Sequence, residues 1–316
     1  MPINIVVPDD YPIVMASCNA YRRLVDEHPL THHATLPGSE DVLVERIRDF
    51  EAVINIRSST KFTDRVFAEC PRMKILSIWG TGTDNVDLKA AQKYGVTVTN
   101  TPGVAAISIA EHALMLTLAV ARRVVPLHRQ VVNGEWPRGQ SVQLRGKTLG
   151  IIGLGAIGRQ FAKLGEAIGM RVIAWTMHPD PRLGFELVER DELLRESDVI
   201  SVHLRLSSET TGFLGLREFD LMKPAAILIN TARGPIVEEA ALIEAIRSRR
   251  IAGAGLDVFD VEPLPPGHPL TQLDNVVVTP HCAGVTPEVL EAGLALAIAN
   301  VESFVLGTPR HIVSPG

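Results

Sequence analysis

Cysteine is scarce in this 316-residue chain, and neither a long apolar run nor an excess of one charge sign is present. The cysteines Cys18, Cys70 and Cys282 are scattered and lack the spacing of metal ligands, so the sequence favours neither a disulfide scaffold nor a metal site. A sparse, odd count fits a reducing compartment. We therefore expect a cytoplasmic protein that holds no metal.

The charges are nearly balanced, with 31 Lys and Arg against 36 Asp and Glu, a net charge of −5 and a pI near 6.1. No long basic run is present, so neither nucleic acid nor a membrane surface is an expected partner. The N-terminal MPINIVVPDD lacks a positively charged start, and we expect no signal peptide. The apolar stretch AEHALMLTLAVARR is interrupted by Glu111 and His112 and is too short to span a bilayer.

Short β-branched runs alternate with amphipathic segments along the chain, which is typical of βα units around parallel sheets. The first third contains INIVV, AVINI, KILSIW and VTVTN, and the remainder contains KTLGIIG, RVIAW, DVISVHL, AAILINTA, GAGLDVF and NVVVTP. These strands are too many for one ordinary doubly wound sheet. We therefore predict an α/β protein with two doubly wound parallel-sheet domains.

Two turns mark the expected domain boundaries. One is NTPG at residues 100–103, where Pro102 is expected to open a long helix, and the other lies near residues 284–287. The last helix, PEVLEAGLALAIANVESFVLG, is too apolar on one face to stand alone and is expected to pack on the first domain. The prediction is a discontinuous domain of residues 1–99 and 285–316, with residues 100–284 inserted as a second domain.

The segment GLGAIG fits the glycine-rich fingerprint of a dinucleotide-binding turn, because the strand KTLGII precedes it and the helix RQFAKLGEAIGM follows. Gly153 permits the tight turn, Gly155 admits a pyrophosphate, and Gly158 lets helix and strand pack closely. Ala156 and Ile157 begin the helix whose N-terminus would hold the phosphate. The alternative is a purely structural strand-to-helix turn.

The acid that usually binds the cofactor ribose is missing, because the position about 20 residues after the glycine turn is Thr176. Threonine does not repel a 2′-phosphate as a carboxylate does, so NADP is slightly favoured over NAD. Arg182, Arg205 and His178 are the nearby cationic candidates. The alternative is that Asp180 or a backbone carbonyl binds the ribose and that the arginines are only solvated.

Three charged residues follow predicted strand ends: Arg233 in INTARGPIV, Glu262 in LDVFDVEP and His281 in VTPHCAG. In an open α/β sheet such positions face the ligand crevice. They supply a cation for an acid substrate, a group that exchanges protons near neutral pH, and a carboxylate to tune it. Taken singly, each has a structural alternative, such as a capping arginine, a solvated glutamate or a core histidine.

Several ordered motifs along almost the whole chain resemble those of the D-isomer-specific 2-hydroxyacid dehydrogenases, which include phosphoglycerate dehydrogenase and glyoxylate/hydroxypyruvate reductase. The resemblance is carried by GTGTDNVDL, NTPG with AEHAL, LRGKTLGIIGLGAIG, NTARGPIVEEAAL, GAGLDVFDVEPL and TPHCAGVT. It implies a Rossmann nucleotide domain inserted in a flavodoxin-like substrate domain, with the active site in the cleft between them. It also implies a homodimer formed through the nucleotide domain.

The resemblance further implies hydride transfer between NAD(P) and a small 2-oxo or D-2-hydroxy acid. In this interpretation His281 is the acid/base, Glu262 the carboxylate that tunes it, and Arg233 the carboxylate-binding cation. The remaining positions that match the family's cofactor contacts are Thr231, Ala232 and Asp257, the last beside the nicotinamide carboxamide. The positions that match its substrate contacts are Trp79 and Gly80, whose backbone N–H groups would hold the carboxylate, and Arg57.

The sequence departs from the family pattern around both ligands. Ala105 replaces an asparagine, Trp79 replaces a small residue, Arg205 replaces a proline, and Thr176 replaces the ribose acid. Two alternatives therefore remain open: a nucleotide-sensing protein like the transcriptional corepressors of this fold, and phosphoglycerate dehydrogenase proper. Arg57 and the GTGTDNVDL loop favour the latter, whereas Ala105 does not.

Overall fold

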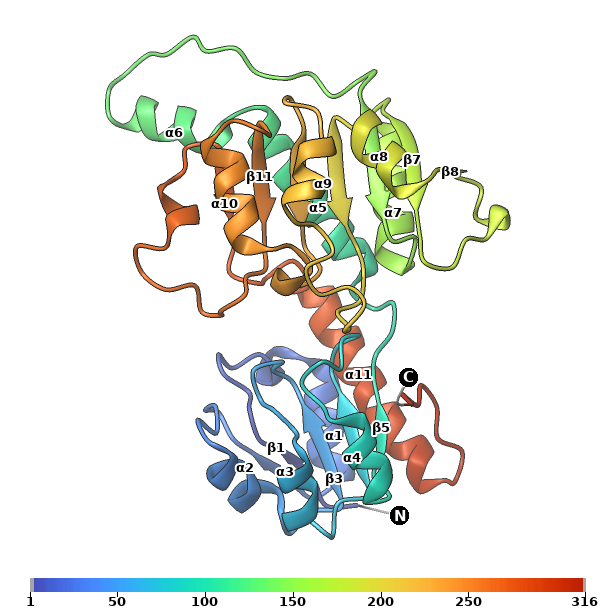
Figure 1. Cartoon of the computed structure of the whole chain (residues 1–316). Helices are drawn as coiled ribbons and strands as arrows, with labels where there is room; N and C mark the ends of the chain where they lie inside the picture. Colours follow the sequence, from blue (N-terminus) through green and yellow to red (C-terminus); the bar gives the residue numbers. More distant parts are fainter. Residues whose placement is uncertain (1–2, 315–316) are drawn as a thin grey trace. The chain divides into compact units, whose positions relative to one another are not determined.

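The computed structural model describes residues 3–314 and divides into two units (Figure 1). Unit 1 comprises residues 1–105 and 285–316, and unit 2 comprises residues 106–284. Each unit contains one parallel sheet, of five strands in unit 1 and seven in unit 2. This confirms the predicted fold class of two doubly wound parallel-sheet domains, one inserted in the other.

Unit 1 has the strand order β2-β1-β3-β4-β5 of a flavodoxin-like sheet. Its strands are β1 (Ile5–Val7), β2 (Leu30–His32), β3 (Ala52–Asn55), β4 (Ile75–Ile78) and β5 (Thr97–Thr99). Its helices are α1 (Asn19–Glu27), α2 (Glu40–Ile47), α3 (Asp64–Glu69), α4 (Leu88–Lys93) and α11 (Pro287–Val305). Successive strand residues point to opposite faces, so α2, α3 and α4 cover one side of the sheet while α1 and α11 cover the other.

The C-terminal helix α11 returns to the N-terminal unit as predicted, and Figure 1 shows it beside the blue elements. Leu294, Ile298 and Val301 of α11 are fully buried in the core that contains Ile5 and Ile75. The hydroxyl of Ser77 in β4 also donates to the Ala297 carbonyl, at 3.0 Å. Burial of its apolar face explains why this helix closes the first domain rather than standing alone.

Unit 2 has the strand order β12-β11-β10-β9-β6-β7-β8, which contains the Rossmann order with β6 as its first strand. The strands are β6 (Thr148–Ile152), β7 (Arg171–Trp175), β8 (Glu186–Leu187), β9 (Val199–Val202), β10 (Ile227–Asn230), β11 (Gly253–Leu256) and β12 (Val276–Val278). Helices α5 (Ala106–Ala121) and α7 (Ala156–Ala167) cover one face, and α8 (Arg190–Glu196), α9 (Leu216–Leu221) and α10 (Glu239–Arg247) cover the other.

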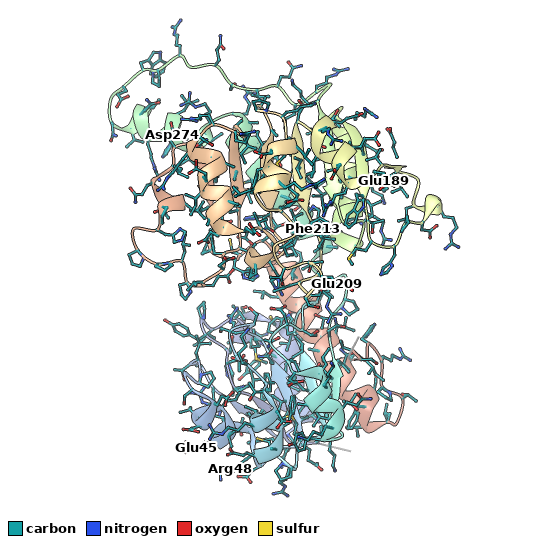
Figure 2. The ribbon with its side chains drawn as sticks, in the orientation of Figure 1. Glu45, Arg48, Glu189, Glu209, Phe213 and Asp274 are labelled. Carbon is teal, nitrogen blue, oxygen red and sulfur yellow. The ribbon has the colours of Figure 1, made fainter. Side chains whose placement is uncertain are left out.

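One helix of unit 2 stands apart from these layers. Helix α6 (Val124–Val132) is described in full and has no buried residue. The segment 133–147 that follows contains no helix or strand, and it forms the long green arc of Figure 1. Charged side chains lie on the outside of both units. Examples are the exposed Glu45, Arg48 and Glu189, which are labelled in Figure 2.

Three details differ from the sequence predictions. The short strands β2 and β8 were not predicted, because neither carries an apolar run; β8 has only two residues. The long helix begins at Ala106, four residues after Pro102, since residues 102–105 form turns. The unit boundary accordingly lies at 105/106 rather than 99/100, because the Asn100 and Thr101 N–H groups bond to the His311 and Gly80 carbonyls of unit 1.

No helix in the described part of the chain is both long and apolar enough to cross a membrane.

Candidate active site

Loops at the carboxyl ends of three neighbouring strands carry the residues that the sequence singled out. Arg233 follows β10, Glu262 lies in the loop after β11, and His281 follows β12. Strands β10, β11 and β12 pair in parallel, so their carboxyl ends lie on the same edge of the sheet. The fold therefore places these three loops side by side within unit 2.

The histidine and the glutamate form a direct pair. The Nδ1 atom of His281 lies 2.6 Å from Oε2 of Glu262, and the two side chains are 35% and 33% exposed. The other carboxylate oxygen, Oε1, accepts the backbone N–H of Phe259 at 3.0 Å, which fixes the carboxylate plane. Because Nδ1 is bonded to the carboxylate, Nε2 is the ring nitrogen left to act on a ligand.

The charges around Glu262 keep it ionised. Burial is the largest single influence and raises the pKa of this carboxyl, but the hydrogen bond and charge of His281 oppose it. The Phe259 N–H and the Arg233 charge act in the same direction as His281, and the net result is a lowered pKa. A carboxylate that stays charged beside an imidazole suits a histidine that must hold a proton.

The turn that carries Arg233 is shaped by Asn230, the last residue of β10. The Asn230 side chain is 2% exposed; its amide donates to the Arg233 carbonyl at 2.9 Å, and its oxygen accepts the Ala232 N–H at 3.0 Å. Gly234 follows, and a Cβ there would lie 2.1 Å from the backbone carbon of Phe259. Only glycine lets the Arg233 turn approach the Phe259–Glu262 loop this closely.

The glycine-rich turn between β6 and α7 has the geometry that its spacing predicted. Gly153 has a φ of +99°, and its Cβ would lie 2.7 Å from the His203 carbonyl oxygen. A Cβ at Gly158 would lie 2.0 Å from the Gly153 carbonyl oxygen, whereas one at Gly155 would meet nothing within 4 Å. The turn is thus closed on the protein side and open at the N-terminus of α7, where Ala156, Ile157 and Gly158 lie in the first turn.

These features fit a dinucleotide. The open space at Gly155 suits a pyrophosphate. So do the N–H groups of the first helical turn, because a helix offers them no intrahelical acceptor. At the end of β10 the Thr231 hydroxyl is buried and has no hydrogen-bond partner among the described residues. A buried polar atom without a partner is rare in proteins, and a bound ligand would satisfy it.

The residues expected near the adenosine of the cofactor lie after β7, the strand that pairs with β6. Thr176 directly follows β7, whose last residue, Trp175, accepts the Gly153 N–H through its carbonyl. The Trp175 ring contacts Phe213, which Figure 2 labels, with ring centroids 5.1 Å apart. Arg182 is 89% exposed and forms an ion pair with Asp180, 2.8 Å between Nη2 and Oδ2. The structure therefore leaves Thr176 and Arg182 accessible at this end of the sheet.

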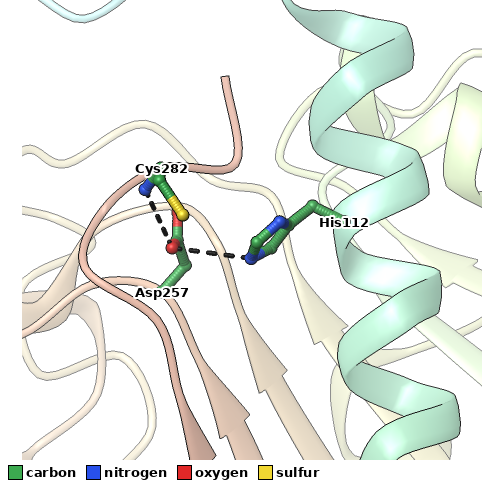
Figure 3. A group of neighbouring side chains, drawn as sticks. All are labelled: His112, Asp257 and Cys282. Carbon is green, nitrogen blue, oxygen red and sulfur yellow. Dashed lines mark hydrogen bonds and ion pairs between the residues drawn. The ribbon is translucent and has the colours of Figure 1, made fainter. Parts of the chain in front are cut away.

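Asp257, predicted to contact the nicotinamide, is 1% exposed and bonded to the loop that carries His281. Its carboxylate accepts the Thr279 hydroxyl at 2.6 Å and the backbone N–H groups of Cys282 and Ala283 at 3.0 and 2.8 Å. His112 of helix α5 lies nearby, with Nε2 3.5 Å from Oδ1 of Asp257 (Figure 3). The Asp257 carboxylate thus holds the loop of residues 279–283 in place, whether or not it also contacts a cofactor.

Two of the three predicted substrate residues of unit 1, Trp79 and Arg57, are bonded to other atoms of that unit. The Trp79 N–H donates to the Asn55 carbonyl at 2.8 Å, so it does not offer this group to a substrate as predicted. Its side chain is only 9% exposed and packs where a Cβ on Gly293 would clash. Trp79 directly follows β4, and this bond continues the pairing of β4 with β3 beyond Ile78. Gly80 is partly exposed and lies at the start of the loop after β4.

The Arg57 guanidinium is partly buried, and desolvation is the main cause of its lowered pKa. Its Nη2 atom donates to the Pro12 carbonyl and lies 4.0 Å from Oδ1 of the buried Asp10. The Nε atom is buried without a partner among the described residues. Unit 1 therefore supplies an acceptor and a nearby carboxylate for the Nη2 atom of Arg57.

Comparison with known proteins decides the family. Residues 114–283, more than half of the chain, match the model of the NAD-binding domain of D-isomer-specific 2-hydroxyacid dehydrogenases. The chain belongs to this family. It is therefore an oxidoreductase that uses NAD(P), and the predicted family assignment is confirmed.

Individual relatives support the same conclusion. The chain is 41% identical to a glyoxylate reductase of Aeropyrum pernix, over 88% of this chain and 87% of that protein. It is 42% identical to a D-3-phosphoglycerate dehydrogenase of Archaeoglobus fulgidus, over 86% of this chain but only 52% of that protein, so it spans about half of that relative. A solved acyclic imino acid reductase in complex with NADPH and D-Arg has a TM-score of 0.90 and 28% identity, over 98% of this chain and all of that one.

Some residues that shape the site were not predicted. Asn230 forms the turn that carries Arg233, and Thr279 and His112 reach the Asp257 carboxylate. Asn230 and Thr279 were recognisable as polar residues at strand ends, the positions that face a ligand crevice. His112 gave no such signal, because a polar residue in an apolar helix is more often a solvated interruption.

Proposed function

We propose that this oxidoreductase interconverts a small D-2-hydroxy acid and its 2-oxo acid, with His281 as the acid/base. Glu262 holds the imidazole in place and tunes it, and Arg233 binds the substrate carboxylate. The observation that supports this most strongly is the 2.6 Å contact between His281 Nδ1 and Glu262 Oε2 at the carboxyl end of the nucleotide-binding sheet. A histidine paired in this way, and about one-third exposed, has the geometry of a general acid.

Each of the three side chains has a separate role in the proposed reaction. When bound, the nicotinamide cofactor supplies the hydride for reduction and accepts it for oxidation. Protonated His281 gives its Nε2 proton to the carbonyl oxygen of the 2-oxo acid and takes it back in the reverse direction. Glu262 stays ionised and stabilises the imidazolium, while Arg233 orients the substrate carboxylate through its fork of N–H donors. Thr231, Ala232 and Asp257 complete the proposed cofactor contacts, together with the glycine-rich turn.

A small, unphosphorylated substrate such as glyoxylate or hydroxypyruvate is favoured over phosphohydroxypyruvate. Arg57, whose position favours phosphoglycerate dehydrogenase, has its Nη2 atom bonded to the Pro12 carbonyl and 4.0 Å from Oδ1 of Asp10. In unit 1, Gly80 remains the proposed backbone contact for the substrate carboxylate.

NADP is slightly favoured as the cofactor. Thr176 brings no negative charge to the end of β7, and Arg182, which is exposed and paired with Asp180, lies six residues further on. The similar solved structure of an acyclic imino acid reductase, which is in complex with NADPH, is consistent with this proposal. Arg205 is the second candidate phosphate ligand, exposed after β9.

The proposed assembly is a homodimer formed through unit 2. Its support is a set of exposed apolar side chains on α5, α6 and the segment that follows. The members are Ile107, Met115, Leu118, Val124, Val131, Val132, Trp136 and Val142. Large exposed apolar surfaces of this kind mark protein interfaces. Sedimentation of the wild type and of a Val132→Glu, Trp136→Ala double variant tests the idea, with a dimer and a monomer as the expected species.

Turnover against a substrate panel tests the function. Oxidation of NADPH and of NADH is followed separately with glyoxylate, hydroxypyruvate, pyruvate and phosphohydroxypyruvate. We expect turnover with glyoxylate and hydroxypyruvate, and a lower KM for NADPH than for NADH. Tight nucleotide binding without turnover on any of the four acids would contradict the proposal and favour a nucleotide-sensing protein.

A further inference from the structure

The turn that carries His281 is held in an uncommon conformation. His281 has a φ of +51°, in the left-handed region that side chains other than glycine rarely adopt. Its own N–H bonds to the Thr279 carbonyl at 3.1 Å, which closes a tight turn over Pro280. Such backbone strain persists only where the surroundings hold it.

Contacts on both sides of His281 provide that support. Before it, the Thr279 hydroxyl donates to Asp257 at 2.6 Å, and after it the N–H groups of Cys282 and Ala283 donate to the same carboxylate. The Ala283 carbonyl accepts the hydroxyl of Ser108, on helix α5, at 2.7 Å. One buried carboxylate and one helix therefore fix the turn from its two ends.

His112 extends these contacts, and the direction of each hydrogen bond follows from elementary chemistry. The Thr279 hydroxyl has a single proton, which it donates to the Asp257 carboxylate, since an ionised carboxylate has none to give. The same hydroxyl lies 2.9 Å from His112 Nε2. Thr279 must accept there, so His112 carries its proton on Nε2. The chain runs from His112 through Thr279 to Asp257.

We propose that His112, Thr279 and Asp257 form a directed hydrogen-bond chain that holds the turn around His281, with His112 as its positioning residue. This inference rests on the proposed role of His281 as acid/base. Helix α5 contributes through His112 and Ser108, which lie one helical turn apart, so both anchors come from one rigid element. Loss of the His112 donor leaves the Thr279 hydroxyl with one partner fewer and loosens the turn.

The same side chains could be taken for a metal site, because ligand atoms of His112, Asp257 and Cys282 lie within 4.8 Å of one another (Figure 3). Hydrogen bonds account for the cluster more completely. Both Asp257 oxygens already accept N–H or O–H donors. The pKa of the Cys282 thiol is raised, by burial first and then by the Asp257 charge, which keeps the thiol protonated rather than ready to bind a cation.

Two matched pairs of variants test the chain. His112→Leu and Thr279→Val remove the donor and the hydroxyl at nearly constant size, whereas His112→Gln and Thr279→Ser retain them. We expect kcat to fall roughly tenfold or more in the first of each pair, because a small misplacement of a catalytic group is costly. We expect the KM for glyoxylate and the Kd for the nucleotide to stay within about twofold, and the conservative variants to recover most of the rate.

A second readout does not depend on activity. Exchange of the Cys282 and Ala283 amide protons, measured by mass spectrometry or NMR without cofactor, reports directly on the bonds to Asp257. We expect exchange to be about tenfold faster or more in His112→Leu and close to wild type in His112→Gln. If the wild type shows no turnover, the proposed function fails, while this measurement still supports or overturns the chain.

Two results would overturn the proposal. One is equal exchange rates and equal kcat in the Leu and Gln variants, which would make His112 a packing residue only. The other is loss of activity on treatment with EDTA and its return with Zn²⁺, which would show that the three side chains hold a metal.

Discussion

The carboxyl ends of the two sheets carry acidic groups in contrasting environments. In unit 1, Asp9 and Asp10 are fully buried after β1, and Asp9 accepts the N–H groups of Ile56 and Arg57. In unit 2, Glu262 is one-third exposed and paired with His281. Burial is the largest influence on both acids, yet the pKa of Asp9 is raised and that of Glu262 is lowered.

The difference lies in the partners. Asp9 is bonded mainly to neutral donors of its own unit, including Asn55, and these do not outweigh desolvation. Around Glu262, the hydrogen bond and charge of His281, the Phe259 N–H and the Arg233 charge together outweigh desolvation, so its pKa is lowered. The first arrangement holds the backbone of a loop, and the second is the pair that we propose exchanges a proton through its histidine. The two sheets thus carry a buried, loop-bonded acid in one unit and an exposed, histidine-paired acid in the other.

The largest expected effect comes from removing the cation of the second arrangement. We expect Arg233→Ala to lower kcat/KM for glyoxylate by roughly a hundred- to a thousandfold, because a preorganised charged donor is lost. Arg233→Lys should recover part of the rate, since it restores the charge without the planar fork. Steady-state kinetics check this, with Arg195→Ala on the exposed face of α8 as the control. Equal kcat/KM values in Arg233→Ala and Arg195→Ala would contradict the proposed role of Arg233 in substrate binding.

Next in size is the loss of the structural acid. Asp9→Ala removes the acceptor of the Ile56 and Arg57 N–H groups, and we expect the free energy of unfolding to fall by about 2–3 kcal/mol. Urea titration followed by circular dichroism measures it. The exposed Asp26→Ala on α1 should change the free energy by less than about 0.5 kcal/mol. A similar small change in both variants would show that Asp9 is not a structural acid.

A smaller effect is expected at the cofactor position. Thr176→Asp introduces a carboxylate where a 2′-phosphate is proposed to bind, and we expect the KM for NADPH to rise by about tenfold through like-charge repulsion. The KM for NADH should hardly change. The neutral Thr176→Asn is the matched control, since asparagine has the shape of aspartate without its charge. A rise in Thr176→Asn as large as in Thr176→Asp would point to shape rather than charge.

The smallest expected effect is on stability and concerns Glu262. Its pKa is lowered in the folded state, so its charge stabilises the fold above the ordinary glutamate value of 4.5, and this contribution is lost as the pH falls through the lower folded value. We expect wild type to exceed Glu262→Gln in stability by under about 1 kcal/mol at pH 7, because the pair is partly exposed. The difference should vanish in acid. A difference that persists at pH 3 would exclude the ion pair as its cause.

The sequence was sufficient for features set by local chemistry. The glycine-rich turn could be predicted because Gly153 needs a positive φ and Gly158 has no room for a Cβ. The long buried strands were visible as apolar runs, and the edge strands β2 and β8 were not. The positions of Arg233, Glu262 and His281 after strands were predictable because parallel strands end on one edge.

Features that depend on contacts across the chain could not be predicted. His112 and Thr279 are 167 residues apart and meet only in the folded unit. The environment of Arg57 depends on Asp10 and Pro12, which no local pattern connects to it. The Trp79 N–H is taken by strand pairing, and its register is a property of the sheet rather than of the loop sequence.

The central claim is that His281 exchanges the proton, and the rate of glyoxylate reduction by His281→Gln tests it most directly. Glutamine keeps a hydrogen-bonding side chain but cannot serve as an acid near neutral pH. With nucleotide binding and thermal stability verified as unchanged, we expect kcat to fall by about a hundredfold or more. A His281→Gln enzyme that reduces glyoxylate at the wild-type rate would contradict the claim.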